Sequence, residues 1–276
     1  DQDGWQAFED DLGRQGEGST PIFVLVDVIE EELRRESIPP LRGENRKQVL
    51  KRRLERLFQA TPYRRAVSQG RGTDKQENIL YSGLVNPDLV SPWMKRLQAH
   101  RAPVVGIWSL QLLSRGLLRE ISVKTDHALV VTLHCDGLRQ TFFQRGRTLI
   151  SRKTPLPSQE GAALFEYIRQ EIVRTRSYLL SLRLLDGDQL LEIFLVAPHR
   201  LSTNLPADRT VIADATFHFV EDSSLEKQVG IHRKEKGSGS ELLYGQLLLR
   251  RPPRNHYGCP EELQYGSSHL LRRVLH

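Results

Sequence analysis

Residues 127–198 constrain the fold of this chain more than any other stretch. Three short strand-like segments follow one another there, separated by turn signals at residues 136–137 and at Gly146. The first is an apolar run, and the third alternates polar and apolar residues. β-branched and aromatic residues between glycine-containing turns are typical of β-hairpins. The pattern predicts a meander of three antiparallel strands, with Cys135 packed as a small apolar residue in the buried first strand. The predicted strands are 127–135, 138–146 and 147–152.

A helix and a fourth strand follow the meander. Apolar residues recur at helical spacing from Leu164 to Thr175, and the apolar run 190–196 ends at Ala197 and Pro198. We expect the apolar faces of these elements to share one core. The residues predicted to lie in that core are Leu129, Val131, Leu133, Ile168, Ile172, Ile193 and Leu195.

The order of meander, helix and strand resembles half of an actin-like ATPase fold. Residues 171–178, followed by a turn and a strand, resemble the helix before the last core strand of the PilM proteins of type IV pilus assembly. The cytoplasmic domains of GspL, the type II secretion L protein, are relatives of PilM. The resemblance implies an α/β, actin-like (ribonuclease H-like) fold of two lobes, with mixed sheets flanked by helices. It places the lobes at 1–124, with an insert subdomain at about 44–101, and at 125–276.

The same resemblance bears on nucleotide binding. In that family the first hairpin carries an Asp-x-Gly-x-x-x-Thr-like loop for ATP phosphates and metal, and Thr132 and His134 stand at its Asp and Gly positions. A carboxylate positions the metal, and a glycine lets backbone N–H groups approach phosphate. A family Gly-Gly pair is replaced by Ala197 and Pro198. The resemblance therefore argues against ATP hydrolysis and against an ATP–Mg cofactor. Were a nucleotide to bind, the candidate residues are Asp136, Gly137, Gly237 and Gly239.

A basic helix is predicted over residues 44–58. Its apolar stripe runs from Val49 to Phe58, and basic residues cover the remainder. Such a surface suits an anionic lipid, an acidic partner or nucleic acid, and a solvated helix face is the alternative. No exposed aromatic residues interleave with the charges, and helix-turn-helix or zinc-finger spacing is absent, which argues against nucleic acid. The predicted partner or lipid surface comprises Arg46, Lys47, Arg52 and Arg53, with Arg272 and Arg273 from the C-terminal tail.

Composition excludes several classes of protein. The net charge is +6, and the two cysteines lie far apart in sequence, which favours a reducing compartment over a disulfide framework. No apolar run approaches the roughly 18–20 residues of a membrane span. The sequence shows neither a nucleophile-elbow pattern nor metal-ligand spacing of His and Cys. We therefore predict no catalytic residue and no metal site.

The C-terminal segment suggests a place at a membrane. Residues 257–262 resemble a Tyr-x-x-Pro-Glu-Glu-like motif that precedes a membrane helix in GspL-type proteins. We therefore expect residues 250–276 to form a juxtamembrane-like tail. Lys and Arg are enriched in short cytoplasmic flanks of membrane helices. Because the chain begins at Asp1 without a methionine, we expect flanking residues in a longer protein.

Together these features predict a non-catalytic cytoplasmic scaffold at the inner membrane, in a pilus or secretion-type assembly. Its partner would be an inner-membrane assembly protein or a membrane segment downstream in its own chain, with anionic lipid as a further partner. Two alternatives stay open. The first is an ATP-binding actin-like protein with altered loops, and the second is a basic nucleic-acid-binding module built on residues 46–56.

Overall fold

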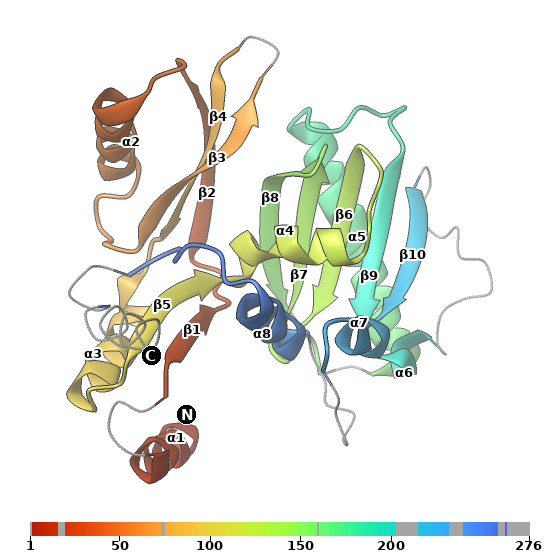
Figure 1. Ribbon diagram of the computed structural model, residues 1–276. Coiled ribbons are helices and arrows are strands. Elements are labelled where there is room, and N and C mark those ends of the chain that lie inside the picture. The colour runs from red at the N-terminus through yellow and green to blue at the C-terminus, as the bar shows by residue number, and fades with distance from the viewer. Residues whose placement is uncertain are drawn as a thin grey trace. The chain divides into compact units, whose positions relative to one another are not determined.

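A computed structural model describes residues 2–15, 20–72, 75–158, 160–202, 215–231, 240–258 and 263. The chain divides into two compact units, 1–109 with 253–276, and 110–252 (Figure 1). This division differs from the predicted lobes 1–124 and 125–276. The helix that begins at Leu110 packs against the helix that begins at Glu241, within the second unit, and Tyr257 pairs with Ile107 in the first.

The second unit contains a five-stranded mixed sheet in the order β10-β9-β6-β7-β8. β6, β7 and β8, the first three strands of this unit, form the antiparallel meander predicted from the sequence. β9 then lies parallel to β6, and β10 lies parallel to β9. The strands are β6 His127–Leu133, β7 Gly137–Gln144, β8 Arg147–Pro155, β9 Leu191–Ala197 and β10 Ala215–Glu221.

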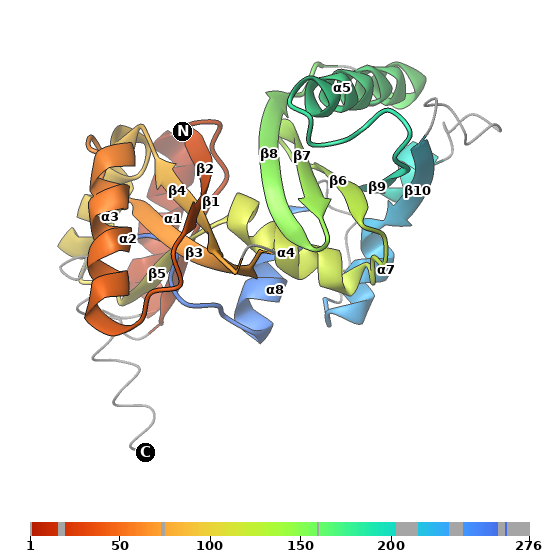
Figure 2. The ribbon, with the colours of Figure 1, turned by 90° about the horizontal axis from the view of Figure 1, so that it is seen from above.

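Helices cover both faces of this sheet. α5 lies on one face, and α4, α7 and α8 lie on the other (Figure 2). The long helix α5 matches the predicted helix between the meander and the fourth strand. The helices of this unit are α4 Leu110–Glu120, α5 Gly161–Ser181, α6 His199–Ser202, α7 Asp222–Gln228 and α8 Glu241–Arg250.

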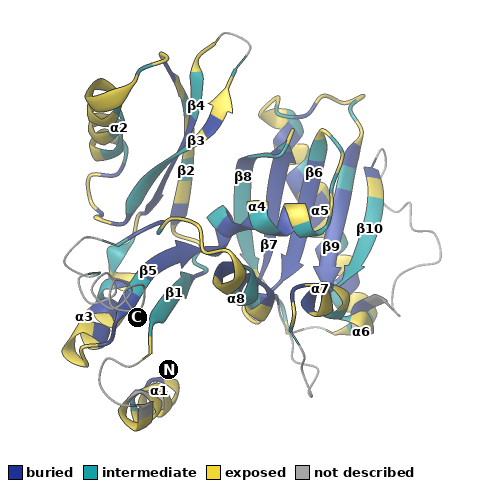
Figure 3. Cartoon of the chain, viewed as in Figure 1, coloured by how far each residue is buried: buried dark blue, intermediate teal, exposed yellow. Residues whose placement is uncertain are grey.

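The predicted core is confirmed. All seven predicted core residues are buried and belong to one cluster between the sheet and α5 (Figure 3). The prediction that Cys135 packs in the buried first strand is wrong, because this residue is exposed. β6 ends at Leu133 and the chain must reverse before β7 begins at Gly137. The residues between them therefore form a turn at the end of the sheet and do not extend the buried strand.

The first unit contains a two-stranded parallel sheet of β1 and β5. Trp5 of α1 is buried and lies edge-on to Trp93 of α3, with ring centroids 4.8 Å apart. The 3-10 helix η1 before α3 is capped by the side chain of Asn86, which accepts the N–H of Asp88. These elements are α1 Gln2–Gln15, β1 Ile22–Val26, η1 Pro87–Leu89, α3 Ser91–Ala99 and β5 Val104–Ser109.

A subdomain is inserted between β1 and η1. It is an antiparallel sheet in the order β2-β4-β3, with α2 packed against it (Figure 1). The segment that follows the apolar run of β1 is strand β2. Ile38, Phe58, Ile79 and Tyr81 form the buried centre of this packing. The elements are β2 Glu31–Ile38, α2 Gly43–Leu57, β3 Arg64–Arg71 and β4 Glu77–Leu84.

Residues 259–262 and 264–276 of the predicted juxtamembrane-like tail lie outside the described residues. Within the described residues, no helix combines the length and the apolar character needed to cross a bilayer.

Candidate functional site

The turn between β6 and β7 is where the resemblance places a phosphate loop. Thr132 and His134 are both buried, and their Oγ1 and Nε2 atoms are hydrogen-bonded at 2.8 Å. The backbone N–H of His134 donates to the carbonyl of Gly137 at 2.8 Å, which closes the turn. The imidazole packs near the ring of Tyr244 on α8, with centroids 5.8 Å apart. A bulky side chain thus occupies the position that the resemblance aligns with a glycine.

The first residues of α8 lie against this turn. The Cys135 N–H donates to Oε1 of Glu241 at 2.6 Å, and Nδ1 of His134 lies 3.7 Å from the same oxygen. The Ser240 N–H donates to the carbonyl of Leu133 at 2.9 Å. A hydrogen bond from a backbone N–H to a carboxylate is charge-assisted, and therefore stronger than one between neutral groups. The turn amide at Cys135 is therefore already bound to an anionic group of the chain itself.

Glu241 also determines the chemistry of the exposed thiol. The pKa of Cys135 is raised, first by its hydrogen bond to Glu241 and then by partial burial and the nearby carboxylates of Glu241 and Asp136. Because the thiolate is the reactive form of cysteine, a raised pKa makes this side chain a poor nucleophile.

The predicted nucleotide residues occupy different settings. Asp136 is exposed at the tip of the turn and pairs with the buried Nζ of Lys153 at 2.7 Å. Gly137 is the first residue of β7, and a Cβ there would lie 2.6 Å from Cε of Lys153. Its lack of a side chain thus makes room for Lys153. Gly237 and Gly239 lie outside the described residues. In the described ranges, which omit 203–214 and 232–239, no group of three or more His, Cys, Asp or Glu could hold a metal ion.

The basic helix α2 is partly neutralised by the sheet it covers. Arg46 makes two hydrogen bonds to the carboxylate of Glu77 on β4, at 2.7 and 2.9 Å. This contact is the first cause that lowers the pKa of Glu77 to about 2. Arg53 lies 3.4 Å from Glu36 on β2, an ion pair between α2 and the sheet. Two of the four predicted surface cations on this helix therefore face carboxylates of their own subdomain.

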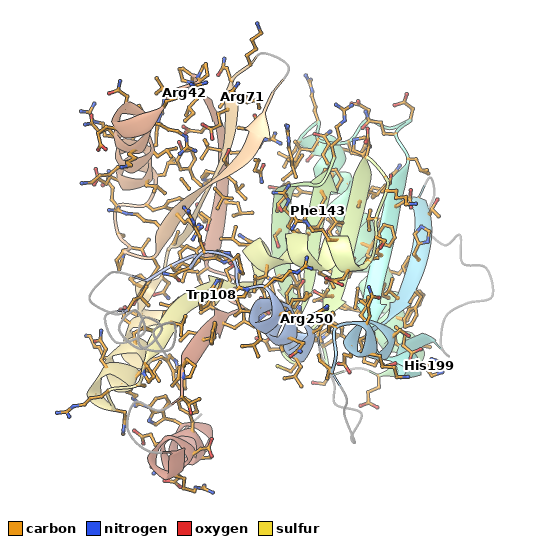
Figure 4. All side chains as sticks on the ribbon, viewed as in Figure 1. Arg42, Arg71, Trp108, Phe143, His199 and Arg250 are labelled. Atoms are coloured by element: carbon orange, nitrogen blue, oxygen red, sulfur yellow. The ribbon has the colours of Figure 1, made fainter. Side chains whose placement is uncertain are left out.

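The remaining positive charge lies on the outer side of α2. Lys47 is exposed and pairs with Glu44 at 3.3 Å, whereas Lys51 and Arg52 are exposed on the same helix. Arg42, exposed just before the first turn of α2, adds to this charge (Figure 4). Arg272 and Arg273, the tail part of the predicted surface, lie outside the described residues. The exposed pair of Lys47 and Glu44 contributes little to stability.

Sequence reasoning missed a buried polar cluster in the first unit. Glu31 of β2 accepts hydrogen bonds from the hydroxyls of Ser109, at 2.5 Å, and Tyr257, at 2.7 Å. Tyr257 also contacts the hydroxyl of Ser82. The His256 Nδ1 accepts the Ser109 N–H at 3.1 Å. Burial is the first cause of two shifts, a raised pKa of Tyr257 and a pKa of His256 lowered to about 3.

This cluster fixes residues 253–257 against β5. Trp108 donates its indole N–H to the carbonyl of Pro253 at 3.1 Å, and the Ile107 N–H donates to Oδ1 of Asn255 at 2.8 Å. The sequence drew attention to Tyr257 as part of a membrane flank, but its hydroxyl is a buried structural donor. Glu31, inside a run of three glutamates, carried no signal that one of the three would be buried.

Comparisons with known proteins bear on the fold. No protein-family model matches the chain, and no curated protein matches it. A solved structure described as the PilM–PilN type IV pilus biogenesis complex aligns with a TM-score of 0.52 and 11% identity, over 93% of this chain and 80% of that chain. That likeness concerns the fold alone. With the observed sheet order, it confirms the predicted actin-like α/β fold.

Two further solved structures are similar at lower TM-scores. The cytoplasmic domain of EpsL, an inner membrane component of the type II secretion system of Vibrio cholerae, aligns at 0.42 and 14% identity, over 90% of this chain and 81% of that chain. A Bacteroides thetaiotaomicron protein with an actin-like ATPase fold and unknown function aligns with a TM-score of 0.34 and 12% identity, over 77% of this chain and 75% of that chain.

Proposed function

We propose that this chain is a non-catalytic actin-like scaffold of an inner-membrane pilus or secretion-type assembly. The proposal is supported by the shared fold with a structure of the PilM–PilN type IV pilus biogenesis complex. In this role the chain lies on the cytoplasmic side of the inner membrane and binds an assembly protein there. The exposed cations on the outer side of α2 offer a surface for an acidic partner or an anionic leaflet.

The observation that carries the non-catalytic part is the contact between the Cys135 N–H and the Glu241 carboxylate. A phosphate entering the turn would meet a negative charge in place of an open N–H. Thr132 offers a hydroxyl already bonded to His134, where a metal would need a carboxylate. The carboxylate of Asp136 is paired with Lys153. The described residues of the turn therefore fit a magnesium–nucleotide poorly, and we propose that ATP is neither bound tightly nor hydrolysed.

Calorimetric titration with ATP and magnesium tests this part. We expect no saturable heat up to about 1 mM nucleotide. A Kd of about 1 mM corresponds to a binding free energy of only about 4 kcal/mol. Glu241→Gln is the matched variant, because it keeps an acceptor for the Cys135 N–H but removes the charge. Weak phosphate binding that appears in this variant alone would support exclusion by the carboxylate. Micromolar, magnesium-dependent binding by the unaltered chain would instead favour the ATP-binding alternative.

Crosslinking in cells tests the scaffold itself. A tagged chain, crosslinked and purified from the native organism, should carry a pilus or secretion component of the inner-membrane fraction. Arg52→Glu should weaken that capture, and Glu55→Gln on the same exposed side of α2 is the control. Recovery of nucleic acid, with binding that falls steeply with salt, would contradict the proposal and favour the nucleic-acid alternative.

A further inference from the structure

The inserted subdomain carries the net charge of the whole chain. Residues 31–84 contain 13 Lys and Arg against 7 Asp and Glu, and this excess equals the chain's net charge of +6. Of the 40 basic and 34 acidic residues, 27 of each kind remain for the rest of the chain. Charge that is concentrated in one part of a chain points to a partner of opposite charge for that part. The positive field of this protein thus originates in the inserted subdomain.

Carboxylates on the strands of this subdomain are occupied by contacts of its own fold. Glu31 is buried, and its carboxylate accepts hydrogen bonds from two hydroxyl groups. Glu77 of β4 pairs with Arg46 of α2 at 2.7 Å. Glu36 of β2 pairs with Arg53 of α2 at 3.4 Å. These three carboxylates neutralise groups between α2 and the sheet, and they leave the cations on the outer side of α2 uncompensated.

Cations outnumber carboxylates on the outer side of α2, which is exposed (Figure 3). No Asp or Glu in the described part of the chain forms an ion pair with Arg42, Lys51 or Arg52. Lys51 stands one helical turn after Lys47, so their side chains share one side of the helix. We call Arg42, Lys47, Lys51 and Arg52 the outer cations. The exposed charged residues of α2 and its first flank are Arg42, Lys47, Lys51, Arg52 and Arg56 against Glu44 and Glu55.

The surface around these cations lacks apolar anchors. Across the described residues 31–72 and 75–84, no large apolar side chain is exposed. Protein–protein interfaces are anchored by aromatic and aliphatic side chains at their centre, and single-stranded nucleic acid stacks on exposed aromatic rings. A helix that enters the acyl layer of a membrane also needs an apolar face toward it. Lys and Arg without apolar neighbours suit a layer of anionic lipid headgroups, which they contact at the surface.

We propose that the outer cations of α2 bind the anionic headgroups of a membrane leaflet, and that no side chain of α2 enters the acyl layer. The inference rests on the proposed function, which puts the chain at the inner membrane, and it adds which surface faces the leaflet. Each Lys or Arg near an anionic surface strengthens binding about fivefold. The contact is purely electrostatic, so it weakens as added salt shortens the Debye length from about 10 Å at 0.1 M to about 4 Å at 0.5 M.

Vesicle flotation of the full chain tests the inference. The probe is phosphatidylcholine vesicles that contain about 30% phosphatidylglycerol, compared with vesicles of phosphatidylcholine alone. We expect binding to the anionic vesicles only, at about 0.05 M salt, and release by about 0.5 M salt. Binding to both kinds of vesicle, or to neither, would overturn the proposal.

Two double variants separate a defined surface from attraction by net charge. Lys51→Glu with Arg52→Glu should lower the partition coefficient more than about tenfold, because two outer cations become anions. Lys124→Glu with Lys227→Glu makes the same change of charge at exposed positions of the second unit, and should lower it less than about threefold. Equal losses in the two variants would show attraction without a defined surface and would overturn the proposal. Circular dichroism checks the fold of both.

Acetylation of lysines in the unaltered chain keeps the test valid if a variant does not fold. A water-soluble reagent acetylates exposed amines, and peptide mass spectrometry gives the rate at each lysine. Saturating anionic vesicles should slow acetylation of Lys47 and Lys51 more than about fivefold and change that of Lys124 and Lys227 less than about twofold. Equal protection of all four lysines, or protection of none, would overturn the proposal.

Duplex DNA of about 20 base pairs separates lipid from nucleic acid. If the duplex protects Lys47 and Lys51 at a lower phosphate concentration than the vesicles do, the occupant is nucleic acid and the proposal is overturned. The proposed function fails separately. Vesicle binding through α2, without a pilus or secretion component after crosslinking in cells, would contradict the proposed function alone. Capture of such a component, without vesicle protection of α2, would contradict this inference alone.

Discussion

Replacing Ile193 with alanine should destabilise the second unit by about 4 kcal/mol. Ile193 lies in the middle of β9, is fully buried, and pairs with Leu129 of β6 and Phe217 of β10. The substitution removes three carbon atoms, and at about 0.8 kcal/mol for each buried CH₂ the transfer cost is about 2.4 kcal/mol. The ladders on both sides hold the neighbouring strands apart, so the space does not collapse, and the cavity adds about 1–2 kcal/mol.

Native-state hydrogen exchange measures this loss where it occurs. The amides of β6 and β9 should exchange about a thousandfold faster, since about 1.4 kcal/mol corresponds to a factor of ten. Val173→Ala on α5 is the control, because Val173 is 39% exposed and should cost less than about 1 kcal/mol. All 3 tryptophans, Trp5, Trp93 and Trp108, belong to the first unit, so their fluorescence reports separately on that unit. A loss below about 1 kcal/mol in Ile193→Ala would refute the argument that the ladders enclose this side chain.

Three further predictions follow from the polar contacts. Glu241→Ala should lower the pKa of Cys135, so alkylation of this thiol by iodoacetamide at mildly alkaline pH should be faster when followed by peptide mass spectrometry; an unchanged rate would contradict the assigned cause. His256 is held neutral in the folded chain by a pKa of about 3, against 6.5 for the ordinary side chain, so the unfolded state binds the proton first and stability falls as the pH drops from about 6.5 toward 3. His256→Gln should flatten that pH dependence in urea unfolding, and an unaltered slope would exclude His256 as its source. Tyr257→Phe removes the hydroxyl donor to the buried Glu31 carboxylate and should cost about 1–3 kcal/mol, whereas a neutral result would show that water replaces it.

Local pattern was enough to predict the central part of the fold. Glycine-containing turns and β-branched segments identified the meander, and 3.6-residue periodicity identified α5. The seven predicted core residues are buried because alternation along a strand, or periodicity along a helix, already fixes which face is apolar. The end of the first strand was misplaced. Cys135 continues an apolar run, and only the need to reverse the chain before Gly137 puts it in the exposed turn.

The candidate site could be located from the sequence but not characterised. Thr132 and His134 marked the turn, yet nothing near them indicated that Glu241, 106 residues beyond Cys135, would bind its N–H. In the same way Arg46 looked like a surface cation until β4 brought Glu77, 31 residues away, to within hydrogen-bonding distance. A local charge pattern reports what a helix carries and not what faces it.

By itself, then, the amino-acid sequence determined which segments are strands and helices and which of their faces are apolar, because those properties depend on neighbours a few residues apart. The tertiary structure decided which strand lies beside which, and therefore which charges are neutralised and which hydroxyls are buried. Glu31 and Tyr257 meet across 226 residues. β1 pairs with β5, from which it is separated in sequence by the whole inserted subdomain. Both outcomes depend on long-range pairing, which short-range periodicity does not encode.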